Sequence, residues 1–380
     1  MMKKFMMCAA ALLASVATSY AEKTVTLADG SDRSALAGVS VFSSNGLIIG
    51  LSDGDGKIAV TPGDYPLSFR CLGYEALTLS DAEADSVMMM PASYNLAEVE
   101  VNPVDRPITR VLTYAREYSS GASPTDTLQL YSEYMLEYFF VDGKVKGYKK
   151  SDSTAKARAC RRYGRIANSQ GLDSVMMPKP GDELAMLSFG ELNAFVPYDS
   201  REETEQIKNG AVTDTIPGKY SPKYIYRKTN GLFRVDCDVL SRYKNHKWSP
   251  LFFKLMGMTM EIDDASWTVI YNGNKTGIYG LYDFIYGSFN FHILVKGKMF
   301  RWLMGVKQAL EVNCYIEQYP VEIEHLSVDE YKEIRKQRKD QPLPFIMPDN
   351  LQPLPPAVEH LIERITPEIT DAEHGRELRR

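Results

Sequence analysis

The sequence predicts a mainly β protein, in which an N-terminal β-sandwich is followed by a larger antiparallel β domain with a few helices. Two observations support this fold class. Apolar and polar residues alternate with a period of two on both sides of Asn102, as half-buried strands require. Turn sequences that contain glycine separate these runs at short intervals, which is typical of antiparallel hairpins.

Residues 1–21 have the pattern of an export signal. Two lysines supply a positive start, an apolar run follows, and small residues precede Ala21, after which we expect cleavage. The alternative interpretation is a buried N-terminal helix. Cys8 precedes most of the apolar run, where a lipid-anchoring cysteine is not expected. We expect no transmembrane helix, because no second apolar stretch has the length that spans a bilayer.

Residues 22–101 are predicted to form the β-sandwich. Apolar residues alternate around Val39, and Asn45-Gly46 and Asp55-Gly56 are typical of hairpin turns, because glycine accepts the positive φ that such turns need. Gly73 divides a later run into two strands or marks a bulge. About seven short strands at this spacing indicate a sandwich.

Residues 102–121 are predicted to form a linking helix. Asn102-Pro103 ends the preceding strand, and Gly121 ends the helical run. Apolar residues lie at helical spacing between them, at Ile108, Val111, Leu112 and Ala115.

Residues 122–326 are predicted to form the antiparallel β domain. Strands with one solvated face are indicated by alternating runs that start near Tyr134, Phe233 and Trp267. Residues 171–222 interrupt this pattern with proline, glycine and charge, and we expect loops and short helices there.

Residues 327–380 are predicted to hold a charged helix, a Pro-rich segment and a polar tail. Ser327 and Glu330 form a capping-box sequence that starts the helix. The prolines that follow favour an extended segment, and a short last helix is expected at about Val358–Ile365.

Composition excludes some classes of function. The formal net charge is −5, so there is no basic surplus for binding nucleic acid. Four cysteines lie beyond the export signal, far apart and without a CxxC pair, which excludes a zinc ribbon. Two interpretations remain open for Cys71, Cys160, Cys237 and Cys314. They form two disulfides, in any of three pairings, or they are four scattered thiols on strands.

Two short motifs lie in the predicted sandwich. Gly50 to Gly54 spells GxSxG, but the residues that follow alternate as a strand, whereas a nucleophile elbow needs a helix. Asp53 and Asp55 resemble the start of a calcium loop, yet Lys57 occupies a position where that loop needs an oxygen ligand. A glycine-rich hairpin explains both patterns.

The histidines do not form a recognisable metal or catalytic motif. His360 and Glu363 spell HxxE, but only a polar tail with His374 follows. The remaining histidines, His246, His292 and His325, are isolated in sequence and are interpreted as structural residues. We therefore predict no catalytic residue, no metal site and no cofactor.

Four sequence segments resemble the carboxypeptidase-regulatory-like domain of Bacteroidetes envelope proteins. They are Gly38-Val39-Ser40-Val41, Asp53-Gly54-Asp55-Gly56-Lys57, Leu72-Gly73-Tyr74 and Leu96-Ala97-Glu98-Val99. The turn before them reads Ala35-Leu36-Ala37-Gly38, without the proline that is usual there. The resemblance covers residues 22–101 and implies a non-catalytic Ig/prealbumin-like β-sandwich. In that family the domain precedes a receptor plug, a peptidase or an uncharacterised β domain.

These observations predict an exported, non-catalytic binding or scaffolding protein of the cell envelope. We expect it in the periplasm or associated with the outer membrane, with an envelope protein, a glycan or a peptide as its partner. Two alternatives remain: a periplasmic hydrolase with its site in the second domain, in which His246 or His292 would meet carboxylates in a deep pocket, and a small outer-membrane β-barrel. A concave, aromatic-lined sheet would favour binding.

Overall fold

The fold was analysed in a computed structural model of the whole chain. The described residues are 22–80, 84–92, 106–123, 126–141, 144–149, 152, 156–168, 173–176, 213–217, 222–227, 232–238, 240, 249, 254–255, 257–272, 283–298, 308–337, 343–348 and 351–363. None of their helices is long and apolar enough to cross a membrane. The predicted export signal, residues 96–101 and His374 lie outside this part of the chain.

The protein is mainly β, as the sequence predicts, and it divides into two compact units. The N-terminal unit comprises the described parts of Met1–Asn45, Ile49–Cys71 and Glu75–Pro91. The large unit comprises those of Gly46–Ile48, Leu72–Tyr74 and Ala92–Arg380.

The N-terminal unit consists of two small sheets, consistent with the predicted sandwich. One sheet has the order β4-β1-β7 and the other β3-β2-β5-β6. The pairs β1–β4, β2–β5 and β5–β6 are antiparallel, whereas β1 and β7 pair in parallel. The strands are β1 (Lys23–Asp29), β2 (Ser40–Phe42), β3 (Ile48–Leu51), β4 (Lys57–Val60), β5 (Leu67–Arg70), β6 (Leu77–Leu79) and β7 (Ser86–Met89).

The predicted turns of this unit are present. Gly56 has a φ of 74°, and a Cβ at this position would clash with the carbonyl oxygen of Leu27. Gly73, with a φ of 89°, lies between β5 and β6, as predicted. The core between the strands is apolar and includes Val25, Leu27, Val39, Val41, Ile58, Leu67 and Phe69.

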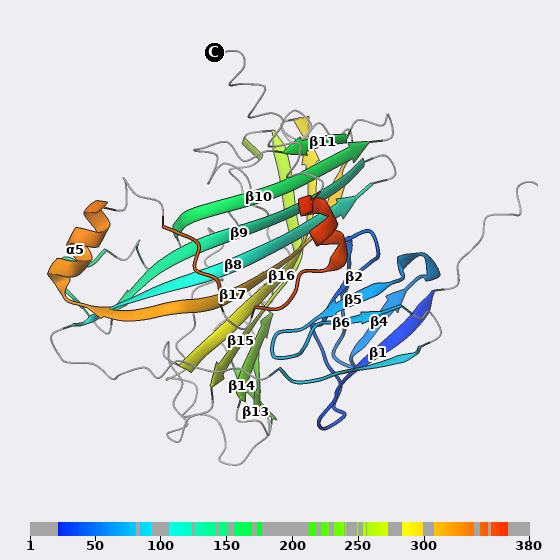
Figure 1. Cartoon of the computed structure of the whole chain (residues 1–380), viewed down its shortest axis with the longest axis horizontal. Coiled ribbons are helices and arrows are strands. Elements are labelled where there is room, and N and C mark those ends of the chain that lie inside the picture. The colour runs from blue at the N-terminus through cyan, green and yellow to red at the C-terminus, as the bar shows by residue number, and fades with distance from the viewer. Residues whose placement is uncertain are drawn as a thin grey trace, which may run out of the picture. The chain divides into compact units, whose positions relative to one another are not determined.

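The large unit is built on one antiparallel sheet in the order β11-β10-β9-β8-β17-β16-β15-β14-β13-β12 (Figure 1). Its longest described strands lie at the centre of this order. The bounds are β8 (Ile108–Ala122), β9 (Asp126–Val141), β10 (Lys156–Asn168), β11 (Asp173–Met176), β12 (Thr213–Pro217), β13 (Pro222–Arg227), β14 (Leu232–Asp238), β15 (Met258–Asn272), β16 (Phe284–Gly297) and β17 (Leu310–Leu326).

The pairing register divides the side chains of this sheet between two faces. Arg116 of β8 pairs with Glu133 of β9 and Glu317 of β17, so these three residues share one face. We call it the strap face. The apolar face is the opposite one, and it carries Leu128 of β9, Phe289, Phe291 and Ile293 of β16, and Val312 and Ile316 of β17.

The helix predicted over residues 102–121 is wrong. Residues 108–122 are strand β8, which pairs along its length with β9 and with β17. The apolar residues at helical spacing coincide with a strand that carries polar side chains on both faces, so its period of two is hidden. Pairing to two long neighbours satisfies the backbone of β8 and outweighs the local signal.

Two further predictions can be compared with the structure. Residues 171–222 were expected to hold loops and short helices, but β11 and β12 are strands of the large sheet. The alternating runs from Tyr134, Phe233 and Trp267 lie in strands β9, β14 and β15, as predicted.

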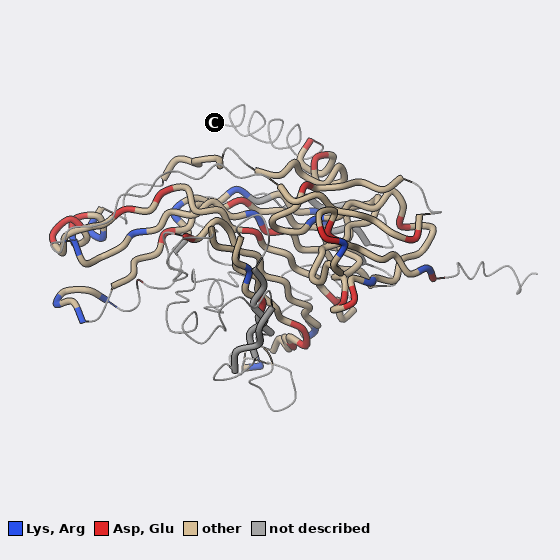
Figure 2. The backbone as a smooth tube through the Cα atoms, turned by 90° about the horizontal axis from the view of Figure 1, so that it is seen from below, with Lys and Arg blue, Asp and Glu red and all other residues tan. Residues whose placement is uncertain are grey.

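Helix α5 (Val328–Gln337) begins at the predicted capping box. The N–H of Ser327 donates to Glu330 Oε2 at 2.7 Å, and the Glu330 N–H donates to Ser327 Oγ at 3.3 Å. Tyr331 anchors the helix against Ile108, Phe139 and Leu326 of the sheet. Acidic and basic positions are mixed at this end of the sheet (Figure 2).

The Pro-rich segment is extended, as predicted. We call residues 343–348 and 351–355 the strap, because they cross the strap face of the sheet (Figure 1). Residues 356–363 then form a short helix, close to the predicted one.

Removing the cap of α5 should loosen this helix. We expect Ser327→Ala to destabilise it by about 1 kcal/mol, since one backbone donor of the first turn loses its acceptor. Amide hydrogen exchange within α5 should then become roughly fivefold faster. Glu333→Ala, on the same helix but away from the cap, is the control; equal exchange in both variants would contradict the capping role.

Candidate functional site

The GxSxG sequence is part of the N-terminal core. Ser52 is buried, its Oγ donates to the carbonyl oxygen of Leu36, and it accepts from the N–H of Val39 at 2.9 Å. Both hydrogen-bonding roles of this hydroxyl are used within the unit. The sequence is thus a structural turn, but the hairpin predicted here is wrong, because β3 and β4 on either side of it lie in different sheets.

The Asp53 loop is a hydrogen-bonded turn. Asp53 Oδ1 accepts from the N–H groups of Asp55 and Lys57 at 2.9 and 2.8 Å. Within the described residues, no group of three or more His, Cys, Asp or Glu side chains is arranged to hold a metal ion.

The histidines named by the sequence are separated in the fold. His292 of β16 lies 2.5 Å from Asp263 at a bulge in β15, and both side chains are partly exposed. His325 lies near Thr109, at the other end of β17. His360 and Glu363 are exposed and 3.4 Å apart, so HxxE is a surface pair. His246 lies outside the described residues.

Three of the four cysteines beyond the export signal can be assigned. Cys71, Cys160 and Cys314 are thiols and form no disulfide. The side chain of Cys237 lies outside the description. Of the two possibilities left by the sequence, scattered thiols on or beside strands fit these three residues.

Buried charges on the strap face form a compensated network. Glu137 is fully buried and accepts from Arg110 at 2.7 Å and from Arg158 at 2.6 Å. Arg110 also pairs with Glu324. Each of these arginines thus faces a carboxylate, as burial of charge requires.

Tyrosine hydroxyls extend this network of buried charges. Glu133 accepts from the hydroxyls of Tyr114 at 2.6 Å and Tyr131 at 2.9 Å. Burial raises the pKa values of both tyrosines, and the neighbouring Glu133 raises them further, so they remain neutral donors. Glu317 is surrounded in the same way by Tyr118, Tyr315 and Arg116.

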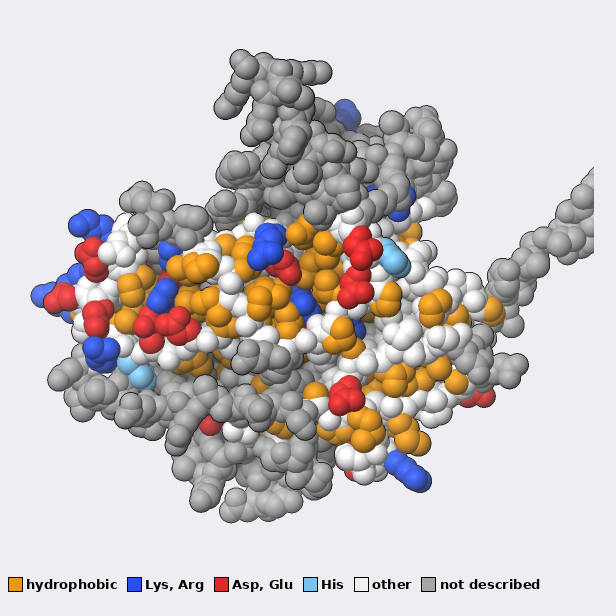
Figure 3. Space-filling view, in the orientation of Figure 1, with side chains coloured by type: hydrophobic (Ala, Val, Ile, Leu, Met, Phe, Trp, Pro, Cys, Tyr) orange, Lys and Arg blue, Asp and Glu red, His pale blue; other side chains and the backbone are white. Residues whose placement is uncertain are grey.

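The strap is fixed to this network. The guanidinium of Arg116 donates to the carbonyl oxygen of Gln352 at 2.6 Å, and that of Arg161 lies 3.9 Å from the centre of the Phe345 ring. The N–H of Leu343 donates to the carbonyl oxygen of Arg158 at 3.1 Å. Apolar and charged side chains are intermixed over this part of the surface (Figure 3). These contacts give the strap face a structural role.

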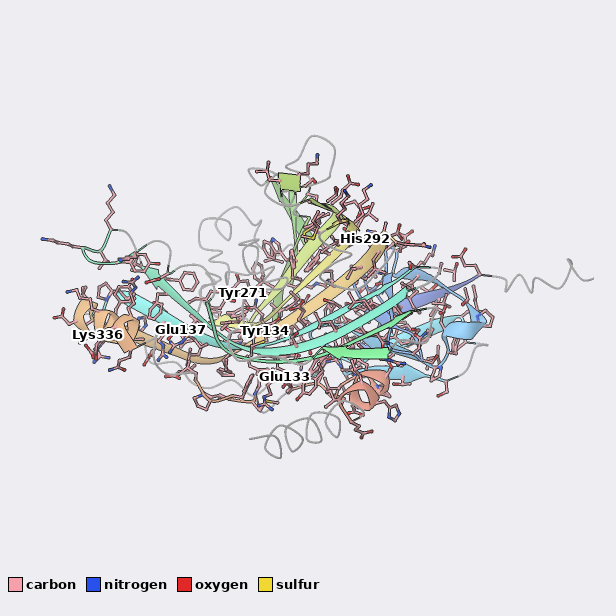
Figure 4. The ribbon with its side chains drawn as sticks, turned by 90° about the horizontal axis from the view of Figure 1, so that it is seen from above. Glu133, Tyr134, Glu137, Tyr271, His292 and Lys336 are labelled. Carbon is pink, nitrogen blue, oxygen red and sulfur yellow. The ribbon has the colours of Figure 1, made fainter. Side chains whose placement is uncertain are left out.

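The apolar face lies on the inner side of the bend in the sheet. In Figure 4, Tyr134 and Tyr271 lie on that side, and Glu133 lies on the other. The described side chains of this face form two clusters. The larger one spans β15, β16 and β17, and the smaller one is built from Phe233, Val235, Val269, Tyr271 and Phe284; Trp267 contacts both.

A polar cluster interrupts the apolar face. The Glu117 carboxylate accepts from Tyr134 Oη at 2.6 Å and from Ser119 Oγ at 3.2 Å. Ser119 Oγ in turn lies 2.8 Å from Cys314 Sγ. Burial and the nearby Glu117 raise the pKa of the Cys314 thiol, which keeps it protonated.

The same face holds two buried polar atoms without a hydrogen-bond partner in the described structure: Gln318 Nε2 and Thr113 Oγ1. Gln318 is 1% exposed and Thr113 is 0% exposed. The other amide atom of Gln318, Oε1, accepts from Tyr138 Oη at 3.0 Å. Unused donors in an apolar setting cost about 1–3 kcal/mol each, so this position is the candidate site.

Sequence reasoning did not find this site, although one signal is present. The face-directed residues of β17 read Leu310, Val312, Cys314, Ile316 and then Gln318, so an amide ends an apolar alternation. Thr113, Glu117 and Ser119 break the pattern of β8 in the same way. Such breaks in a buried face indicate function or a polar network.

We predict that removing the central charge of the strap face is strongly destabilising. Glu137→Gln leaves Arg110 and Arg158 without their shared carboxylate, at an expected cost of about 3–5 kcal/mol. Urea denaturation of the purified protein measures this as a lower midpoint at an unchanged slope. The exposed Glu322, on β17, provides the matched control, for which Glu322→Gln should cost less than about 0.5 kcal/mol. Similar midpoints for the two variants would contradict the network.

Cys314 should resist alkylation. Since burial keeps its thiol protonated, modification of Cys314 by iodoacetamide should stay slow between pH 7 and pH 9 in the folded protein. In urea the rate should rise with pH, as for an ordinary thiol. Peptide mass spectrometry follows each cysteine separately, and fast, pH-dependent labelling of Cys314 in the folded protein would disprove this environment.

No family model matches the chain, and no curated protein is similar to it. Among solved structures, one described as "lipid-protein interactions in lipovitellin" is 10% identical, with a TM-score of 0.28; the match covers 65% of this chain and 27% of that chain. Pseudomonas aeruginosa OccK11 (OpdR) is 10% identical, with a TM-score of 0.11, over 75% of this chain and 64% of that one. TM-scores this low do not indicate a shared fold.

Proposed function

We propose that this is an exported, non-catalytic binding protein of the cell envelope, whose large sheet binds an amphipathic lipid on its apolar face. The observation that carries the proposal is the pair of buried atoms, Gln318 Nε2 and Thr113 Oγ1, which have no hydrogen-bond partner among the described residues of this largely apolar face. A ligand with an apolar body and one polar group matches both parts of this surface.

The layers of the large unit support this placement. The strap and α5 contact the sheet through residues of the strap face, such as Tyr114, Met135 and Phe139. An apolar sheet face must also be covered in water. The described apolar side chains of this face are already buried within the chain, so a bound lipid would replace part of their present cover.

The dimensions of the face suit one acyl chain. The apolar side chains of β17 from Leu310 to Ile316 lead to Gln318, a distance of about 26 Å at ~3.3 Å per residue. An acyl chain fills one leaflet, about 15 Å, or half of the ~30 Å hydrocarbon core of a bilayer. The apolar run of β17 is therefore longer than one acyl chain, although its side chains are already buried within the chain.

The chemistry of the polar cluster favours binding over hydrolysis. Cys314 is held as a thiol, and Ser119 contacts a carboxylate and this thiol, with no histidine among the described side chains of the cluster. An activated nucleophile needs a base of suitable pKa within hydrogen-bond reach, and neither group has this arrangement. A hydrolase is the second candidate function. Its expected residue His246 lies outside the described residues.

The compartment and the partner remain proposals that rest on the sequence. The export pattern of residues 1–21 favours the periplasm or the inner side of the outer membrane. A lipid ligand would bring the protein to that membrane. An envelope protein as partner is compatible with this role, whereas an apolar face is less suited to a glycan.

Trp267 allows a direct test, because this residue contacts both apolar clusters. We expect a brominated acyl lipid to quench tryptophan fluorescence of the folded protein in a saturable way. The signal should persist in a variant that keeps only Trp267, with Trp248→Phe and Trp302→Phe, and it should disappear in Trp267→Phe. Quenching that is unaffected by Trp267→Phe, or no quenching at all, would rule out binding at this face.

A further inference from the structure

We infer that one end of the large sheet, where β15 begins and β16 ends, docks on a membrane surface that carries anionic lipids. Its described contact residues are Lys254, Leu255, Lys296 and Lys298, which we call the basic tip. The inference goes beyond the proposed function, because it concerns how the protein meets a bilayer and not the ligand of the apolar face. Three features support it: the joining of two segments, their exposed side chains, and their charges.

The two segments of the basic tip are held together by the sheet. Met258, the first residue of β15, pairs with Gly297, the last residue of β16. Gly297 has a φ of 126°, and a Cβ at this position would clash with the carbonyl oxygen of Gly257. The N–H of Gly257 donates to the carbonyl oxygen of Lys254 at 3.0 Å, which closes a turn. The segments before β15 and after β16 therefore leave the sheet at one place.

The basic tip exposes a large apolar side chain beside lysines. Leu255 is 80% exposed, more than any other large apolar residue in the described part of the chain. The three lysines of the tip are exposed as well. A single exposed leucine is common on soluble proteins and indicates nothing by itself. Together with cations it is typical of interfacial segments, whose apolar groups enter the headgroup region while the cations contact lipid phosphates.

The charges of the flanking sequence have one sign. Residues 239–260 and 284–310 contain no Asp or Glu, and each stretch contains four Lys or Arg residues. The whole chain, by contrast, has a formal net charge of −5. Along β15 and β17, carboxylates first appear at Glu261 and Glu311, which both pair with Leu294, two positions inside Lys296. The basic residues of these two stretches therefore favour an anionic partner.

A bilayer fits both the charge and the apolar side chain of the tip. A second copy of this chain would bring the lysines of two tips together, which like-charge repulsion opposes. A nucleic acid would contact the lysines and leave Leu255 in water. Anionic headgroups attract each lysine by about 1 kcal/mol, or about fivefold in affinity. The interface also buries Leu255, which is favourable for an apolar side chain.

Flotation of the purified protein with vesicles tests the docking. We expect binding to vesicles rich in phosphatidylglycerol, and roughly tenfold weaker binding to phosphatidylcholine alone. Combining Lys254→Gln, Lys296→Gln and Lys298→Gln should reduce the affinity for the anionic vesicles about a hundredfold, and the difference should shrink in high salt. Leu255→Ser should reduce the affinity about fivefold at every salt concentration, because burial of an apolar group is not screened.

Three lysines near α5 provide the matched control. Lys144, Lys146 and Lys149 are exposed, and their combined change to Gln alters the net charge equally. This variant should bind the anionic vesicles as the native protein does. All variants share residues 1–21, so this segment cannot cause a difference between them.

Three results would overturn the inference: equal binding to neutral vesicles, an equal loss of affinity in the control variant, or unchanged binding by Leu255→Ser. The last result would indicate a soluble polyanion, such as a nucleic acid or an acidic protein, as the partner of the lysines. Quenching of Trp267 by a monomeric brominated lipid should be the same in the lysine variant and the native protein. The proposed function and the docking surface can therefore fail independently.

Discussion

Strand β8 pairs with a long strand on each side, and this double pairing fixes the rest of the large unit. Its residues pair with β9 in one register along the whole strand, and with β17 in a register that shifts once, at the bulge between Pro320 and Glu322. The period of a strand is two, so Arg116 belongs to one face and Glu117 to the other. A slip of one residue would exchange the two faces and bring Arg116 among apolar side chains. The buried charges therefore depend on this register, and they also help to specify it.

The strap face shows how a sheet can have a polar core. Arg116 lies between Glu133 and Glu317 on the neighbouring strands, while Arg110 and Arg158 share Glu137. Burying such ions has a high desolvation cost, and their mutual pairing roughly offsets it. These pairs favour one strand register over the others, because the arginine and tyrosine donors meet the carboxylates only when the strands pair as observed. The strap completes the cover by accepting a hydrogen bond from Arg116.

The sequence predicted the strands that have one apolar face and missed the one that has polar groups on both. Strands β9, β14 and β15 alternate clearly, so their period of two is visible. In β8, by contrast, arginine and tyrosine occupy one face, and threonine, glutamate and serine occupy the other. The remaining apolar residues of β8 lie by coincidence at the spacing that is typical of a helix. Its conformation is determined by pairing with β9 and with β17, which lies about two hundred residues further along the chain.

The candidate site was beyond sequence reasoning for a related reason. Tyr138 and Gln318 are 180 residues apart, and their hydrogen bond forms because β8 lies between the two strands that carry them. A glutamine in an apolar alternation can be seen in the sequence, but its partner cannot.

The carboxylates of the strap face and the amide on the apolar face differ in how their hydrogen-bonding groups are satisfied. On the strap face, Glu133, Glu137 and Glu317 each accept from two or more donors. On the apolar face, Gln318 uses its acceptor and keeps its donor buried without a partner. A leucine at this position would avoid that cost and pack as well with Ile316. The amide at position 318 therefore lowers the stability of the sheet, whereas the carboxylates of the strap face are compensated by their donors.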